Sequence, residues 1–361
     1  MSKRKHARAS SSQIDLEEEN RELRNEVQSL RAELAKRDAP VAPEPSIAKM
    51  FVLKHVFENV TDMENNDVQV SIFEDHFGLR WRMSVRKTAG HVSIHLWCQN
   101  PANSDVVTWS VETEFIMSLK AARTFDHTKS FLYTFRKNED HDPFHGSYEF
   151  LTWEEMERDC LTRDGKLMAE VQVSIKRTKG LYPKNLRCFD ASTSDLSDVI
   201  LVVNGEKFHV SKLTLATQST YFKIIFFGAF KEAAKKEIDL PGLAESDFQK
   251  YLEVVYGHEC IDDATVEGVL LIADMYDTEI VREKCEKFLI DHSAKSSKKK
   301  LELSTRYGLE ALKNKCFARI ETVREIESLI PNDILDMDHS TMGAILQKSI
   351  AMLKARPTSH Q

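Results

Sequence analysis

A β-hairpin signal that runs directly into two helix N-caps constrains this chain more than any other feature. Residues 199–203 read Val-Ile-Leu-Val-Val, which is typical of a buried strand, and a second apolar run follows at once. Asn204-Gly205 between them favours a two-residue turn, because Asn and Gly accept the positive φ angles that this turn requires. Ser211 and Ser219 then stand where helix N-caps belong. The segment therefore predicts a strand hairpin followed by helices.

Beyond the hairpin, the pattern is mainly helical. Helices are expected at residues 212–217, 219–228, 246–256, 264–276 and 278–291. Residues 237–240 read as a short strand that Pro241-Gly242 stops. Together these elements make an α+β domain. Apolar positions between residues 301 and 320 predict further amphipathic helices.

Between residues 50 and 180 the apolar period changes to two. Apolar residues alternate with polar ones in Leu79-Arg80-Trp81-Arg82-Met83-Ser84-Val85-Arg86. The same alternation recurs around residues 92–96, 109–119 and 167–175. A period of two marks strands with one buried face. Several such strands at short intervals predict an antiparallel β-sandwich.

Residues 13–38 carry a short heptad pattern, which predicts a coiled coil. An Asn at a core position of such a helix costs stability but fixes the register and favours a parallel pair. Three heptads are marginal on their own. Two interpretations stay open: an autonomous dimer, or a solvated helix that pairs only when another part of the protein brings two chains together. The expected contact residues are Asn20, Leu23, Val27 and Leu30.

Length and composition bound the class of protein. The chain has 361 residues, of which 42% are hydrophobic, enough for two cores. The net charge of −7 gives no global field for nucleic acid, so the basic runs at residues 3–8 and 295–300 are expected to be a solvated tail or loop, with nuclear targeting or nucleic-acid contact as the lesser alternative. Six dispersed cysteines without a CxxC pair match neither a zinc site nor a disulfide framework. No apolar run approaches the ~20 residues that span a bilayer, so we expect a soluble protein of the cytoplasm, the nucleus or both.

The sequence contains no convincing catalytic motif. Cys160 lies near Asp159 and Asp164, with His141 and His145 upstream, which invites comparison with a cysteine hydrolase. A nucleophilic thiol needs a base that a third group holds in place, and the two folded domains leave no stretch for a separate catalytic fold. The glycine count of 12 leaves little scope for a phosphate loop, and the histidines match no metal-ligand spacing. We expect no enzyme activity, no metal and no cofactor.

Two sets of residues resemble known domain families. Phe208-His209-Val210-Ser211-Lys212 followed by Ser219-Thr220-Tyr221-Phe222 resembles the opening of a BTB (POZ) domain. The region before it resembles the MATH (TRAF-like) domain in Phe57-Glu58-Asn59-Val60, Val92-Ser93-Ile94-His95-Leu96-Trp97-Cys98, Trp109-Ser110-Val111-Glu112-Thr113-Glu114-Phe115 and Phe150-Leu151-Thr152-Trp153-Glu154-Glu155-Met156. Because both occur in this order, the chain resembles the MATH-BTB family in the form expanded in nematodes, the speckle-type POZ protein-like adaptors of cullin-3.

The resemblance implies a multidomain chain: an all-β antiparallel sandwich, then an α+β domain, with the short coiled coil in front. The expected parts are a disordered basic tail (1–12), the coiled coil (13–38), a Pro-rich linker (39–49), the MATH domain (50–180), a linker (181–194), the BTB domain (195–292), a C-terminal helical extension (293–354) and a tail (355–361).

The resemblance also implies a cleft for a client peptide, in which an extended segment lies across one sheet. By motif, this cleft maps to His95, Tyr133, His145, Gly146 and Ser147. His95 has independent support, because it lies on the polar side of its strand. The alternative is that Tyr133 belongs to the core and that the histidines are ordinary surface residues.

Clefts of this family commonly carry a Trp-Gly-aromatic loop, whereas this chain has His145-Gly146-Ser147. We therefore expect a more polar cleft than is usual in the family. With Glu112 and Glu114 at its rim, it would prefer ligands that offer hydrogen-bonding or basic positions.

Phe230-Lys231-Glu232 resembles the hydrophobic-x-Glu signature of BTB domains that bind cullin-3. An exposed aromatic ring fills a groove while a carboxylate pairs at the rim, which assigns the cullin contact to Phe230 and Glu232. Alternatively, Phe230 completes the core beside Phe226 and Phe227.

BTB domains of this kind pair through helices near their start, which here include Leu213 and Leu215. The usual helix before the first strand is replaced by residues 190–195, which are rich in loop formers. The coiled coil would compensate for the smaller dimer surface by raising the effective concentration.

The implied function is that of a substrate-recognition adaptor in a cullin-3 RING ubiquitin ligase. The MATH domain binds an unknown target protein, the BTB domain binds cullin-3, and self-association into a homodimer or a higher oligomer presents two or more of each. The alternative is a non-enzymatic BTB scaffold or transcriptional co-regulator that oligomerises without cullin. Nucleic-acid and membrane partners are not expected.

Overall fold

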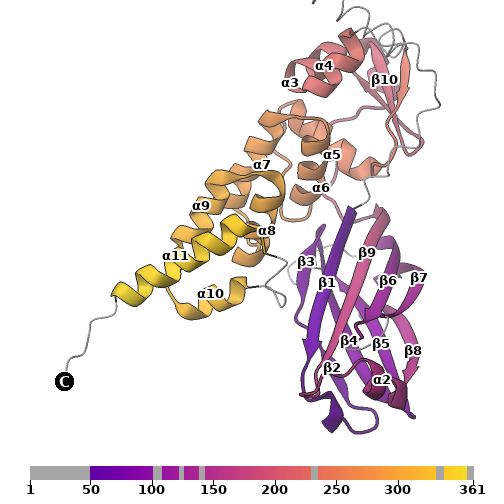
Figure 1. Cartoon of the computed structure of the whole chain (residues 1–361). Helices are drawn as coiled ribbons and strands as arrows, with labels where there is room; N and C mark the ends of the chain where they lie inside the picture. The colour runs from indigo at the N-terminus through magenta and orange to yellow at the C-terminus, as the bar shows by residue number, and fades with distance from the viewer. Residues whose placement is uncertain are drawn as a thin grey trace, which may run out of the picture.

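The computed structural model describes residues 49–100, 108–121, 126–137, 143–228, 235–330 and 337–355. Figure 1 shows a β-sandwich beside a helical region that extends away from it toward the C-terminus. The predicted coiled-coil contacts and the predicted cullin contacts fall outside the described residues: Asn20, Leu23, Val27, Leu30, Phe230 and Glu232. Those assignments stay predictions.

The first half of the chain is a sandwich of two antiparallel sheets. One sheet has the order β1 (Lys49–Phe57), β9 (Leu167–Lys179), β6 (Ser110–Leu119) and β7 (His127–Arg136). The other has the order β2 (Val68–Val70), β4 (Leu79–Thr88), β5 (His91–Gln99) and β8 (Phe144–Thr152), with β3 (Glu74–His76) also paired to β4. We call them the four-stranded and the five-stranded sheet.

Residue alternation along the strands explains the sandwich core. On β4, Leu79, Trp81, Met83 and Val85 are at most 1% exposed, whereas the arginines between them are half-buried on the opposite side. The predicted period of two is thus confirmed. Short helical elements close the ends: η1 (Val60–Asp62), and α2 (Trp153–Asp159), which a capping box between Thr152 and Glu155 begins.

The predicted hairpin is confirmed as β10 (Val199–Val203) and β11 (Glu206–Val210). Asn204 and Gly205 have φ angles of 50° and 84°, as the two-residue turn requires. β12 (Glu237–Asp239) pairs with β10 in parallel. Ser211 and Ser219 cap α3 (Lys212–Gln218) and α4 (Thr220–Phe227) with side-chain hydrogen bonds.

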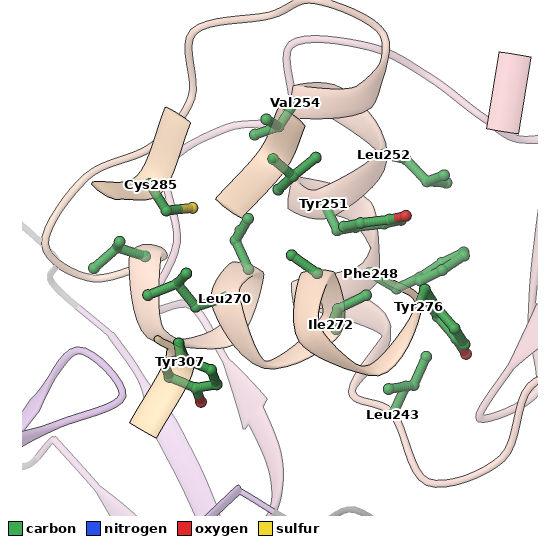
Figure 2. Close-up of a cluster of buried hydrophobic side chains, with 14 of the residues drawn as sticks. Leu243, Phe248, Tyr251, Leu252, Val254, Leu270, Ile272, Tyr276, Cys285 and Tyr307 are labelled. Carbon is green, nitrogen blue, oxygen red and sulfur yellow. The ribbon is translucent and has the colours of Figure 1, made fainter. Parts of the chain in front are cut away.

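Three helices build the core of this second domain: α5 (Glu245–Val255), α6 (Val266–Met275) and α7 (Glu279–Asp291). Figure 2 shows aromatic and aliphatic side chains from α5 and α6 meeting around Phe248, Tyr251 and Tyr276. The Tyr251 hydroxyl has a partner in this dry environment, because it lies 2.7 Å from the hydroxyl oxygen of Thr278. The core is therefore packed without leaving this polar atom unsatisfied.

Four more helices follow: α8 (Ser297–Tyr307), α9 (Glu310–Ala318), α10 (Val323–Leu329) and α11 (His339–Ala355). Leu301, Leu312 and Leu329 belong to the same buried cluster as the BTB-like core, so the extension is continuous with it (Figure 1). No helix of the described segments combines the length and the apolar character that crossing a membrane demands.

The expectation of a solvated basic run at residues 295–300 is wrong. Lys299 and Lys300 are buried in the first turn of α8, and Lys295 is buried just before that helix. The Lys295 and Lys299 ammonium groups lie 2.8 and 3.0 Å from the carboxylate oxygens of Glu267 on α6. Burial acts to raise the pKa of Glu267, yet these two ammonium groups hold that pKa well below its usual range. The lysines thus join the extension to the domain before it.

The sandwich packs directly on the helical region. Leu271 of α6 belongs to the buried cluster of the sandwich, and Lys299 Nζ lies 3.0 Å from Nδ1 of His76 on β3. A Cβ atom on Gly78 would meet Ala264 Cα at 2.9 Å, so the β3–β4 turn and the start of α6 come as close as backbones can. The loop-like segment before β10 is also ordered: residues Ala191–Leu196 form a 3-10 helix, which Asp190 caps.

Candidate protein-interaction sites

The predicted cleft residues Tyr133 and His145 meet between the edges of the two sheets. β7 and β8 are the last strands of their sheets in the described topology, so backbone groups along both lie open to an added strand. Tyr133 projects from β7 and His145 from β8, and their rings stack at 4.0 Å with an interplanar angle of 5°. Phe131 meets the His145 ring edge-on at 5.6 Å. An aromatic floor thus joins the two edges.

His145 is part of this floor rather than a free surface histidine. Partial burial lowers the pKa of its imidazole, which favours the neutral ring at physiological pH. Tyr133 is likewise half-buried. Tyr133 and His145 thus lie together, as expected for residues of one cleft. Their use by a ligand stays a prediction.

Gly146 lets β8 approach β5 at this point. A Cβ atom at Gly146 would lie 2.0 Å from the carbonyl oxygen of Ile94 and 2.8 Å from Cα of His95. The β5–β8 register also shifts between Val92 and Ile94. Only glycine fits at such a separation, which explains why the residue between His145 and Ser147 carries no side chain.

Lys129, which the sequence did not single out, links β7 to β8 beside Ser147. Its Nζ donates to Ser147 Oγ at 3.1 Å and to the carbonyl oxygen of Glu149 at 2.6 Å. This contact bridges the sheet edges next to the aromatic floor and places a positive charge there. Lys129 is an exposed residue of a strand, and nothing in the sequence indicates that such a lysine bridges two strands.

His95 lies on the outer face of the five-stranded sheet, as predicted, since its neighbours Ile94 and Leu96 are at most 1% exposed in the core. It is nevertheless 5% exposed, because Phe144 and Tyr148 cover it edge-on at 5.2 and 4.6 Å. Burial, with the nearby charges of His145 and Arg86, lowers the pKa of His95 to about 4. Its Nε2 atom has no hydrogen-bond partner among the residues that the structure describes.

The expected acidic rim of the cleft is wrong. Glu112 and Glu114 are exposed on the outer face of the four-stranded sheet, and Glu114 pairs with Lys176 at 2.9 Å. Thr113 between them faces inward and donates to the Tyr133 carbonyl at 2.9 Å. Because successive residues of a strand point to opposite faces, the two glutamates cannot border the cleft. The expectation of basic ligand positions therefore loses its basis.

The BTB-like domain exposes an apolar surface at α3 and α4. Leu213 is 65% exposed, Ile224 54% and Phe227 62%. Leu215 is fully buried, so of the predicted dimer pair Leu213 alone is placed to reach a partner chain. Phe227, in contrast to the expectation that it belongs to the core, is exposed. Phe222 and Phe226, four residues apart, take the buried side of α4, and the same helical spacing would have revealed the exposed side.

Cys160 lacks the features of a nucleophile. Its side chain is 1% exposed, and burial together with Asp159 and Asp126 raises the pKa of the thiol to about 11. At that pKa the thiol stays protonated near neutral pH. His145 belongs to the aromatic floor, and His141 lies outside the described residues. No group of three or more metal-ligating side chains gathers within the described ranges.

Comparison with known proteins matches two parts of the chain. Residues 57–175 match the MATH domain and residues 189–293 match the BTB/POZ domain. The chain is similar to BTB and MATH domain-containing protein 15 of Caenorhabditis elegans, at 40% identity over 76% of this chain and 98% of that protein. It is also similar to proteins 45 and 36 of the same name and organism, at 32% identity over 79% of this chain and 60% of the relative, and at 30% over 81% and 92%.

Proposed function

This chain belongs to the family of proteins that join a MATH domain to a BTB/POZ domain, and on that premise we propose that it is a substrate-recognition adaptor of a cullin-3 RING ubiquitin ligase. The MATH domain captures an extended segment of a client protein. The BTB domain binds cullin-3 and a second copy of the chain. No bond chemistry is assigned to the chain itself.

The stacked pair Tyr133 and His145 is the observation that carries client capture. It lies where two sheet edges meet, so an extended segment can form main-chain hydrogen bonds to a strand while its side chains contact the aromatic floor. Lys129 and the close approach at Gly146 fix the shape of this edge. Such a site selects clients by side-chain fit and leaves them chemically unchanged.

The exposed apolar residues of α3 and α4 support the second contact. Ile224 and Phe227 lie on the helix that leads directly to Phe230 and Glu232, the predicted cullin contacts. Exposed aromatic and aliphatic side chains of this kind commonly anchor protein interfaces. Leu213 on α3 lines the same surface hollow as Phe227 and is the remaining candidate for self-association.

The proposed mechanism is proximity. Holding a client beside a ligase arm converts an encounter between client lysine and charged ubiquitin carrier into an effectively intramolecular event. Ubiquitination and proteasomal degradation of the client follow from that arrangement, and self-association presents more than one client site for each assembly.

Two pull-down experiments test the two contacts separately. For the client, tagged full-length protein is used to capture proteins that accumulate when the chain is removed from cells. Tyr133→Ala and His145→Ala should abolish capture, whereas His91→Ala, at the far end of β5, should not. For the ligase, cullin-3 should co-purify with wild type and not with Phe230→Ala/Glu232→Ala. A scaffold that only oligomerises would capture clients and ignore cullin-3.

A further inference from the structure

Three arginines share the outer face of the five-stranded sheet. Arg80, Arg82 and Arg86 alternate on β4 with core residues, so all three project away from the sandwich core. Arg82 lies opposite Trp97 in the β4–β5 register, and Arg86 lies opposite Ser93. The Nε atoms of Arg82 and Arg86 are buried and have no hydrogen-bond partner in the described part of the chain.

Within the described segments, no ion pair joins a carboxylate to Arg82 or Arg86. Asp75 stands across from Arg80 in the β3–β4 register, and no ion pair joins them. The cross-strand neighbours of Arg82 and Arg86 are Trp97, Ser93 and Val68, none of which carries a charge. Arg82 and Arg86 therefore have no counter-charge among their strand neighbours, whereas Arg80 has Asp75 opposite it.

Aromatic rings hold two of the guanidinium groups in place. The Arg80 and Arg82 guanidinium carbons each lie 4.5 Å from the centre of the Phe73 ring, and Arg82 also lies 5.2 Å from Trp97. A guanidinium held between two rings still offers its terminal N–H groups to an acceptor. A guanidinium fixed in this way loses little conformational entropy when it binds an anion.

A row of aromatic side chains runs from Trp97 through Phe144 toward the edge strand β8, where the client cleft lies. Trp97 stacks on Phe144 at 4.5 Å, and Phe144 meets His95 edge-on at 5.2 Å. Phe144 precedes His145 on β8 but faces the outer side with Trp97, whereas His145 faces the inner side with Leu96, so the two surfaces meet around the edge of this last strand. His95 is an independent sign of an unfilled site, because a side chain that is 5% exposed ends in a nitrogen without a partner among the described residues.

We propose that this surface, formed by Phe73, Arg80, Arg82, Arg86 and Trp97, binds an acidic stretch of the client, in an extended conformation and with Asp or Glu side chains facing the arginines. The proposal rests on client capture at the adjoining cleft. Arginine forks bind carboxylates through two parallel hydrogen bonds. Side chains on one face of an extended segment repeat every ~7 Å, which matches the spacing of Arg80 and Arg82 on their own strand.

The chemistry of the surface favours an acidic peptide over nucleic acid. The whole chain carries a net charge of −7, so the attraction is confined to this face and no general field draws a polyanion to the protein. Trp97 and Phe144 also lead to the sheet edge at which the client cleft lies, and that cleft suits a peptide. An acidic client segment extends from the cleft onto the arginines and uses both surfaces at once.

The test measures peptide preference with the full chain. Immobilised protein is exposed to degenerate decapeptide libraries in which one position at a time is fixed as Asp, Glu, Asn, Gln or Lys. Wild type should retain Asp and Glu over their amides about tenfold at positions spaced two and four apart, as Arg80, Arg82 and Arg86 are, because charge-assisted hydrogen bonds to arginine discriminate that strongly. Arg82→Gln and Arg86→Gln should remove the acid preference. Arg163→Gln, an exposed arginine in the turn before β9, should leave it unchanged.

The outcomes separate this proposal from client capture itself. If peptides bind without an acid preference, or if the preference survives Arg82→Gln and Arg86→Gln, the arginine surface is overturned while the cleft stands. If no peptide is enriched, client capture and the arginine surface both fail. If a mixed-sequence oligonucleotide binds through Arg82 and Arg86 and acidic peptides do not, the surface binds nucleic acid and the proposed acidic peptide is wrong. Should Arg82→Gln unfold, Arg86→Gln decides the matter, since Arg86 makes no stacking contact with Phe73 or Trp97.

Discussion

Lys49, the first residue of the sandwich, and Asp247, on α5 of the BTB domain, form an ion pair of 2.7 Å with side chains that are only 4% and 3% exposed. Tyr182, in the segment between the domains, accepts from Lys49 at 3.2 Å and donates to Asp247. Each buried charge is tolerable only because its partners are in place. The cluster therefore fixes how the MATH domain sits on the BTB domain.

Removing one member of this pair should destabilise the protein strongly. Asp247→Asn or Lys49→Met leaves a buried charge alone, which typically costs about 3–5 kcal/mol. The double variant Lys49→Met/Asp247→Leu should recover much of that loss. Denaturant unfolding of the full chain measures it. Glu114→Gln, in the exposed pair with Lys176, is the control and should change stability by no more than about 0.5 kcal/mol. Single variants as stable as this control would contradict the account.

The Glu267 cluster predicts a specific acid sensitivity. A carboxyl whose folded-state pKa is depressed adds stability that is complete above its unfolded pKa of about 4.3 and is lost as pH falls toward the folded pKa. Since Lys295 and Lys299 depress the pKa of Glu267, its contribution should fade below about pH 4.

Comparing unfolding at several pH values tests this sign. Glu267→Gln should be less stable than wild type at neutral pH, and the difference should shrink on acidification. Glu302→Gln, whose carboxylate pairs with Lys299 at 3.1 Å but is 45% exposed, is the matched control with a small effect. A difference between Glu267→Gln and wild type that stays constant down to pH 3 would refute the assignment.

His95 should titrate far below an ordinary histidine. Its pKa is about 4 rather than 6.5, because Phe144 and Tyr148 exclude water from the ring. A depressed pKa adds stability that is full above pH 6.5 and is lost as pH falls toward 4. Histidine ring NMR signals of the full chain, followed from pH 8 to 3, measure the midpoint. A His95 midpoint at its ordinary value would show that the aromatic cover is open in solution.

Gly146→Ala should distort the cleft. Its Cβ atom would overlap the Ile94 carbonyl, which is backbone and cannot rotate away, so β8 must shift from β5. We expect a loss of about 1–3 kcal/mol in stability, as for other overpacked sites, and loss of peptide capture. Gly343→Ala on α11 has open space around it and should be neutral or stabilising. Equal behaviour of the two variants in unfolding and capture would rule out the close approach.

Local patterns along the chain predicted most of the fold. The turn at Asn204-Gly205, the caps at Ser211 and Ser219 and the alternation on β4 depend on neighbouring residues, and all three were correct. Burial of Lys295 and Lys299 was missed, because their partner Glu267 comes from a different helix. A run of lysines looks solvated until its counter-charge is known.

The candidate site, too, was predicted only in part from the sequence. The resemblance pointed to Tyr133 and His145, which stack, but it placed Glu112 and Glu114 at the rim, since sequence alone did not show which strand face meets the cleft. The arginine surface was also missed. Alternation shows that Arg80 and Arg82 leave the core, yet their stacking on Phe73 depends on how the segment before β3 folds back over β4.

Direct binding of cullin-3 tests the central claim, that one chain links a client site to a ligase arm. Purified full-length protein is titrated with the N-terminal domain of cullin-3 by calorimetry. We predict one cullin for each chain with a Kd on the order of 1 μM or tighter, weakened about tenfold or more by Phe230→Ala/Glu232→Ala and unchanged by Glu206→Ala on the exposed hairpin. A folded wild-type chain that shows no heat of binding to cullin-3 at tens of micromolar would contradict the adaptor function.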